Sequence, residues 1–321
     1  MSTPLQFDYT WMGEDAARTL RYFIKHEGAD VNAQTPFGTT ELMHTVERSG
    51  KYATEIMQVL IDANADVNMQ DNNGRTALRM AIQLEDGKDK HRKEMVSFLL
   101  DAGADANMQN RDGWTVLMEV IYSHRQCYME IMRMLIDKKA DLNLQNRSGK
   151  TALMFATDAG DPRAEAIMCL LLDAGADVNM QDFYGWTALM YAAVSGGCRS
   201  SERMRLLINA GADVNMQTKK GETALMLAAN DVFAYLSKEI IYELAYAGTD
   251  FNKKNNSGET AIDLASNSQI KEHLQCIYAE MQRTTFARNV LLSGDGPAAT
   301  CNGKVYIPDD LWREIFAYAV M

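Results

Sequence analysis

The sequence predicts an all-α solenoid of helix-loop-helix units joined by short β-hairpin-like fingers, and two repeated phrases together with the apolar content support this. A Gly-x-Thr-Ala-Leu-Met phrase recurs in graded form at steps of 36, 39, 36, 36, 36 and 37 residues. A second phrase, Gly-Ala-Asp-Val-Asn and its variants, keeps the same period. Self-similarity at a period of about 20 to 50 residues is typical of stacked repeats. With 47% apolar residues and 5 prolines in 321 positions, such a stack can bury a continuous core.

The first phrase predicts the start of a helix. A threonine such as Thr151 or Thr187 can accept a hydrogen bond from the free backbone amides that open a helix. After a short polar connection, apolar residues such as Ile167 and Leu171 follow at helical spacing and predict a second helix with one buried stripe. Neither helix could bury its stripe alone, so each unit needs its neighbours.

The second phrase predicts the end of the second helix. Gly103, Gly175 and Gly211 can adopt the left-handed conformation that closes a helix at little steric cost, and Asn64 tolerates it. Lys139 stands at the equivalent position, where we expect either a different turn or backbone strain. The polar residues that follow suit a short finger leading to the next threonine cap.

These phrases resemble the ankyrin-repeat family over about residues 1–284. The match is nearly position for position in residues 146–217, which contain GKTALMFA, LLDAGADVNMQD and GWTALMYAA. Three features depart from the family pattern: the usual proline of the first helix is Ala, Val or Glu, the usual histidine is mostly Met, and the period is 36 rather than about 33. The extra residues are expected between the two helices, for example in 195–202, with the longest such loop at 84–93.

The repeats divide the chain into five parts. We expect an N-terminal capping repeat at 1–34, six ankyrin repeats at 35–254, and a C-terminal repeat or cap at 255–284. A glycine-rich linker is expected at 285–304, followed by an amphipathic helix at 305–321.

Composition and charge restrict the class of partner. With 32 basic and 43 acidic residues the net charge is −11, which argues against binding to nucleic acid or to an anionic membrane. No apolar run reaches the roughly 18 to 20 residues of a membrane span, and the N-terminus lacks a secretory signal. We therefore expect a cytoplasmic protein, or one in the host cytosol if it is a secreted effector.

Catalytic and cofactor motifs are not expected. The 5 cysteines show neither a CxxC pair nor zinc-ligand spacing, and the 5 histidines are scattered over different repeats. Gly296 and Gly303 are separated by six residues instead of the four of a phosphate loop, and Val305 replaces the Ser or Thr that should follow Lys304. The sequence predicts no enzyme, no metal and no cofactor.

The fingers predict a protein-binding surface, because they carry aromatic and basic side chains at positions that need no core residue. The alternative is that Trp114 and Trp186 fold back as structural packing. The resemblance extends the surface to the first-helix residues Tyr122, Asp158 and Ser195. The predicted partner-binding residues are Phe37, Arg111, Trp114, Tyr122, Arg147, Lys150, Asp158, Phe183, Tyr184, Trp186, Ser195, Lys219 and Lys220.

The asparagine that ends the second phrase allows two interpretations. Asn179 and Asn215 resemble the acceptors of the asparaginyl hydroxylase that modifies ankyrin repeats. The alternative, which the turn chemistry favours, is a structural role in the finger.

The C-terminal segment YIPDDLWREIFAYAVM resembles the opening helix of an F-box, which recruits the adaptor subunit of a ubiquitin ligase. The match covers about 16 residues, and Ile307 stands where the family has Leu. The candidate adaptor-recruiting residues are Pro308, Leu311, Trp312, Ile315 and Phe316. The alternative is a helix that caps the last repeat. The sequence thus predicts a scaffold or adaptor that binds a partner protein and possesses either a ubiquitin-ligase link, as in host-directed effectors, or a purely structural tail.

Overall fold

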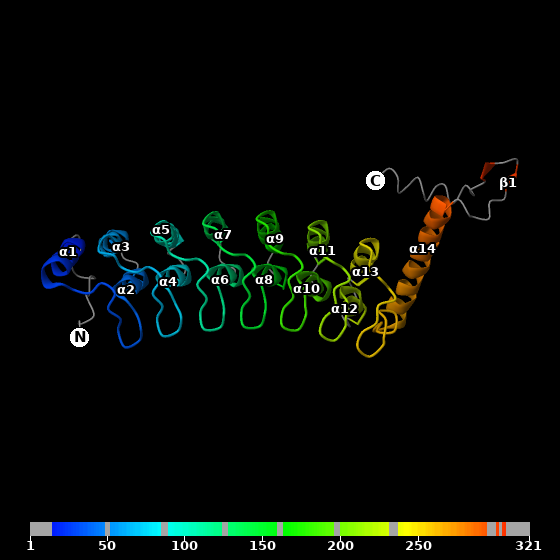
Figure 1. Cartoon of the computed structure of the whole chain (residues 1–321), viewed down its shortest axis with the longest axis horizontal. Coiled ribbons are helices and arrows are strands. Elements are labelled where there is room, and N and C mark those ends of the chain that lie inside the picture. The colour runs from blue at the N-terminus through cyan, green and yellow to red at the C-terminus, as the bar shows by residue number, and fades with distance from the viewer. Residues whose placement is uncertain are drawn as a thin grey trace.

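A computed structural model of the chain describes residues 15–48, 52–84, 89–123, 128–158, 163–195, 200–230, 237–293, 300–301 and 304–305. Its helices form two rows, with finger loops projecting from one edge of the array (Figure 1). The inner row, next to the fingers, is α2 (Glu41–Arg48), α4 (Ala77–Gln83), α6 (Val116–Tyr122), α8 (Ala152–Asp158), α10 (Ala188–Val194) and α12 (Ala224–Asn230). The outer row is α1 (Ala16–Glu27), α3 (Ala53–Asp62), α5 (Asp89–Asp101), α7 (Tyr128–Asp137), α9 (Ala164–Asp173), α11 (Ser200–Asn209) and α13 (Ser237–Tyr246). The predicted solenoid is confirmed.

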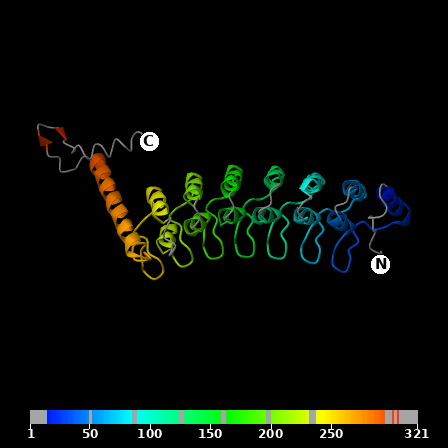
Figure 2. The ribbon, with the colours of Figure 1, turned by 180° about the vertical axis from the view of Figure 1, so that it is seen from behind.

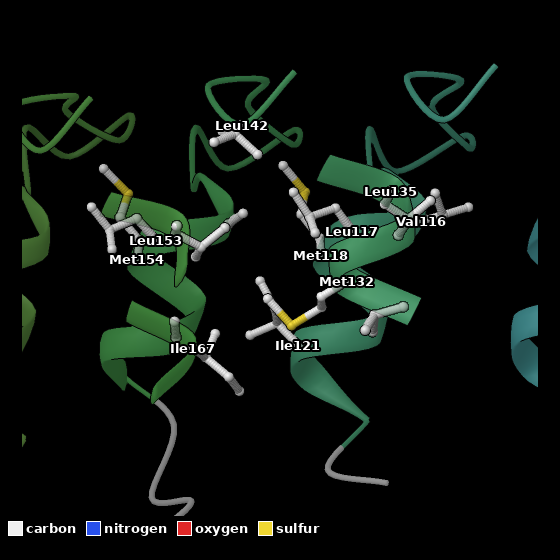
Figure 3. Packing of buried hydrophobic residues seen from close by; sticks show 14 of the residues in the cluster. Val116, Leu117, Met118, Ile121, Met132, Leu135, Leu142, Leu153, Met154 and Ile167 are labelled. Atoms are coloured by element: carbon white, nitrogen blue, oxygen red, sulfur yellow. The ribbon is translucent and has the colours of Figure 1, made fainter. Parts of the chain in front are cut away.

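One continuous hydrophobic core runs between the rows. Leu153, Met154 and Ile167 of one unit lie beside Leu117 and Ile121 of the preceding unit (Figure 3). The repeated methionine of the first phrase fills this core, because each copy in α6, α8, α10 and α12 is 1% exposed. The apolar face of each helix pair is thus covered by the next pair.

The predicted caps are present at both ends of the units. Thr187 Oγ1 accepts a hydrogen bond from the Met190 backbone N–H at 3.3 Å, and Thr151 caps Met154 in the same way at 3.4 Å. Gly175 closes α9 with a φ of 91°. Lys139 adopts the same left-handed conformation, with a φ of 65°, so the chain accepts backbone strain there instead of changing the turn.

The loop between α4 and α5 is shorter than the sequence suggested. The prediction placed it at 84–93, but α5 already begins at Asp89. The connection between α10 and α11 agrees better with its predicted range of 195–202, since α10 ends at Val194 and α11 begins at Ser200.

The last unit departs most from the pattern. Its copy of the first phrase, which begins at Gly258, makes one turn instead of a helix. A new helix then starts where Asn267 Oδ1 accepts from the Ile270 N–H at 2.9 Å. That helix, α14 (Ser268–Ser293), is long and leans away from the array in both views (Figures 1 and 2). It continues through residues 285–293, where the sequence predicts a linker. Beyond it, β1 (Thr300–Cys301) pairs antiparallel with β2 (Lys304–Val305).

Candidate protein-binding surface

Each finger is a tight turn held by a polar side chain inside it. In the finger of residues 182–186, the Asp182 N–H donates to the Trp186 carbonyl at 2.9 Å. Asp182 Oδ1 in turn accepts from the N–H groups of Tyr184 and Trp186, both at 2.8 Å. Asn110 and Asn146 hold the two preceding fingers in the same way. The tip conformation is therefore fixed by the finger's own hydrogen bonds.

Neighbouring fingers are also bonded to one another. The N–H of Arg147 donates to the Asp112 carbonyl at 3.0 Å, and the N–H of Phe183 donates to the Ser148 carbonyl at 3.1 Å. The approach is so close that a Cβ on Gly149 would lie 2.5 Å from the Phe183 nitrogen. The fingers thus form one rigid row, so side chains on the tips are pre-positioned for a partner.

The predicted aromatic tip residues point into solvent. Phe37 is 77% exposed, Phe183 55% and Tyr184 69%, and Tyr122 at the end of α6 is 62% exposed. Phe183 and Tyr184 are adjacent, and neighbouring exposed apolar side chains are typical of an interaction site. Among the other predicted residues, Ser195 is half-buried and the following side chains are exposed: Arg111, Arg147, Asp158, Lys219 and Lys220.

Trp114 and Trp186 do not project from the fingers. Both are half-buried and pack against the core edge of the inner helices. The Trp114 ring lies 4.5 Å from Phe155 and 5.4 Å from Tyr122. Both tryptophans therefore have the packing role of the alternative interpretation, and each side chain also remains partly exposed.

These rings form one of two ring clusters, which together we call the aromatic row. It crosses α6, α8 and α10, and its other half is the Trp186 ring at 5.2 Å from Tyr191. Burial, together with a 2.6 Å hydrogen bond to Asp182, raises the pKa of Tyr191 well above its usual value, so this hydroxyl stays protonated. The aromatic row consists of Trp114, Tyr122, Phe155, Trp186 and Tyr191.

Lys150 and Asp158, both predicted to bind a partner, contact each other within the aromatic row. The Lys150 ammonium lies 3.1 Å from the Asp158 carboxylate and 4.2 Å from the centre of the Tyr191 ring. It is also 5.7 Å from the Phe155 ring. The chain thus holds a cation of its own between two aromatic faces and a carboxylate, which is the geometry of a cation–π site.

Sequence reasoning missed Phe155 and Tyr191, together with a buried ion pair beside them. Arg79, 1% exposed, pairs with Glu119 and also donates to the Trp114 carbonyl. Burial lowers the pKa of Arg79 and raises that of Glu119, since each charge is desolvated. A comparison of the repeats could have identified this ion pair. Arg79 stands where four later repeats have methionine, and Glu119 stands where two of those repeats have an aromatic residue.

Beside this ion pair the surface is hollowed by a pocket of about 340 Å³ between α4 and α6. Its lining is Ile82, Gln83, Asn110, Asp112, Trp114, Glu119, Tyr122, Ser123 and Tyr128. The candidate surface therefore combines exposed finger tips, the aromatic row and one pocket at its N-terminal end.

Comparison with known proteins agrees with this architecture. Matches to the family model for ankyrin repeats cover residues 12–91, 87–182, 159–254 and 197–285. The chain belongs to the ankyrin-repeat family. The ankyrin repeat domain of Bcl-3, described as a unique member of the IkappaB protein family, is similar in structure with a TM-score of 0.61 and 24% identity. The match covers 74% of this ankyrin chain and 99% of the Bcl-3 chain, and at this identity it shows the fold alone. No curated protein matches the chain.

The described part of the ankyrin array has neither a metal-binding cluster nor a membrane-spanning helix. Within the described residues, no group of three or more His, Cys, Asp or Glu side chains is placed to hold a metal ion. None of the described helices is both long and apolar enough to cross a membrane. Ankyrin arrays are protein-interaction modules.

Proposed function

We propose that this ankyrin protein is an adaptor or scaffold that binds one partner protein through the fingers and inner helices of residues 111–195. The observation that carries the proposal is the aromatic row, which lies beside exposed aromatic tips on a rigid row of fingers. Aromatic residues and arginine dominate the binding energy of protein interfaces. Because the fingers are already ordered, little conformational entropy is lost on binding.

Affinity capture with matched variants tests this assignment. Phe183 and Tyr184 are 55% and 69% exposed, so replacing both with Ala removes contact area without opening the core. The control replaces Tyr242 and Tyr246, 39% and 55% exposed on the outer helix α13, with Ala. Partners of the finger surface should be lost from the Phe183→Ala/Tyr184→Ala variant and retained by the control. A set of captured proteins that is the same for all three chains would contradict the assignment.

The C-terminal segment supplies the finer part of the proposal. We propose that residues 305–321 recruit the adaptor subunit of a ubiquitin ligase while the ankyrin array holds the target. This rests on the F-box-like pattern of the sequence, since Pro308, Leu311, Trp312, Ile315 and Phe316 lie outside the described residues. The competing proposal is a plain ankyrin binding module or inhibitor whose tail only caps the array.

A truncation separates these two proposals. The chain should end at Ser293, the last residue of α14, because a shorter chain would cut that helix. Ubiquitin-ligase subunits captured by the intact chain alone, and lost with Leu311→Ala/Trp312→Ala at an unchanged unfolding temperature, would support recruitment. A lower unfolding temperature with unchanged partners would support the cap.

A further inference from the structure

The pocket between α4 and α6 has walls of two kinds. One wall is aromatic, with the rings of Trp114 and Tyr122 at an angle of 79° to each other. The other wall is acidic, with the exposed Asp112 at the finger tip and Glu119 at its inner end. Aromatic faces and carboxylates both attract cations, whereas a purely apolar ligand would gain no interaction from the carboxylates.

A similar space elsewhere in the chain is filled by a cation. At the junction of the fourth and fifth repeats, the Lys150 ammonium occupies the space between Phe155, Tyr191 and Asp158. In the repeat pattern, Gln83 and Glu119 of the pocket are equivalent to Asp158 and Tyr191 of that junction. The pocket is therefore the equivalent space two units earlier.

Among the described residues, no Lys or Arg side chain lines the pocket. Arg75 is the residue equivalent to Lys150, but its Nε donates to Asp71 of its own finger at 2.7 Å. Arg79 lies behind Glu119 and does not line the pocket, and its charge is matched by one Glu119 oxygen. The second Glu119 oxygen accepts only a long 3.4 Å hydrogen bond from Gln83, and so keeps acceptor capacity toward the pocket.

We propose that this pocket binds an arginine side chain of the partner protein. The proposal rests on the adaptor function proposed above and names the chemistry by which the partner is recognised. A guanidinium can stack on the Trp114 or Tyr122 ring while its five N–H donors reach several acceptors at once. Asp112 and Glu119 supply such acceptors around the rim. The net charge of −11 favours the approach of a basic segment.

The test uses Trp114 as the reporter. The full chain is labelled with 5-fluorotryptophan, which gives a fluorine NMR resonance for each of its 4 tryptophans, and Trp114→Phe assigns the relevant one. The probe is Nα-acetyl-arginine amide, and the comparison is Nα-acetyl-citrulline amide, which has the same shape without the charge. We expect the Trp114 resonance to shift saturably at millimolar arginine amide, with little response to citrulline amide and little movement of Trp186.

Two charge variants sharpen the result. Asp112→Asn should weaken binding of the arginine amide by about threefold to tenfold, since it removes one partly screened charge interaction. Asp137→Asn makes the same charge change at an exposed site on α7 and should have little effect. An equal response to citrulline amide, no shift of Trp114, or equal weakening by both variants would overturn the proposal. Those outcomes would not contradict the proposed binding function of the finger surface, because the capture experiment tests that function separately.

Discussion

At the scale of single residues, the asparagine of each Gly-Ala-Asp-Val-Asn phrase ties one unit to the next. Asn179 Oδ1 accepts from the Asp213 N–H at 2.8 Å, and its Nδ2 donates to the Gly211 carbonyl at 3.2 Å. Asn215 repeats both bonds toward Asp250 and Gly248. Because donor and acceptor are both used, these amides have a structural role, which is the interpretation that turn chemistry favours.

A second residue-scale feature is the strain at Lys139. Its φ of 65° lies in the left-handed region, as does the φ of glycines at equivalent positions, such as Gly175 at 91°. Lys139→Gly should raise the free energy of unfolding by about 1 kcal/mol, since removal of the Cβ clash outweighs the greater freedom of the unfolded chain. Urea unfolding measures the change. Gly175→Lys is the converse control and should destabilise the array; a destabilised Lys139→Gly variant would contradict the account.

The Arg79–Glu119 pair gives another prediction at this scale. Arg79→Met alone leaves the Glu119 carboxylate buried without its cation, and should lower the free energy of unfolding by about 3 kcal/mol. The double variant Arg79→Met/Glu119→Leu copies the junction of the fifth and sixth repeats, which has Met190 and Leu227 at the equivalent positions, and should recover most of that loss. Urea unfolding of both variants checks this. Equal destabilisation of the single and double variants would show that the charge is not the cause.

At the scale of elements, the fingers act as a row because their backbones touch. Gly149 and Gly175 both have a positive φ, of 80° and 91°, so alanine strains the two backbones alike. They differ in surroundings, since a Cβ at Gly149 would meet Phe183 while a Cβ at Gly175 would meet nothing within 4 Å. The difference in the free energy of unfolding between the two alanine variants thus measures the contribution of the contact between fingers.

We therefore expect Gly149→Ala to lower the free energy of unfolding by at least about 1 kcal/mol more than Gly175→Ala does. It should also weaken capture of the finger-surface partner, because Phe183 and its exposed neighbour Tyr184 must move. Thermal unfolding and affinity capture measure the two effects. Equal losses of stability in the two variants would mean that the finger row is looser than the close approach indicates.

Another element, the last unit, shows where a repeat phrase is overridden. Its Thr260 still caps, accepting from the Asp263 N–H at 3.4 Å, but the helix stops after one turn. Asn267 then caps α14, which packs on α13 through Ile270 and Leu274, both nearly fully buried. A long helix thus takes the place of the usual pair at the C-terminal end of 12–285, the range that the family model matches.

At the scale of the whole molecule, charge governs how a partner arrives. The chain has a net charge of −11, and the summed field of such a charge attracts a basic partner before contact. We expect the association rate constant of the captured partner to fall about tenfold between about 0.05 and 0.5 M NaCl, with a smaller change in the dissociation rate. Surface plasmon resonance measures both. An association rate that does not depend on salt would contradict electrostatic steering.

The elongated stack also explains how far its fold follows from the sequence. Each unit contacts only its neighbours, so helix starts, helix ends and core positions repeat with the phrase that encodes them. Thr187, Gly175 and Met190 were assignable in this way, and so was the exposure of Phe183 and Tyr184. The aromatic row was not, because Trp114 meets Phe155 across 41 residues of sequence, and no local pattern gives that distance.

The ankyrin architecture and the positions of the finger tips follow from the repeated phrases, since both depend on local turn and cap chemistry at a fixed period. Three features follow from the folded array alone: Lys150 contacts Asp158 and Tyr191, Arg79 is buried against Glu119, and a pocket lies between α4 and α6. The physical reason is that side chains in adjacent units compete for one shared surface. Their partners are set by stacking geometry, which a single repeat does not contain.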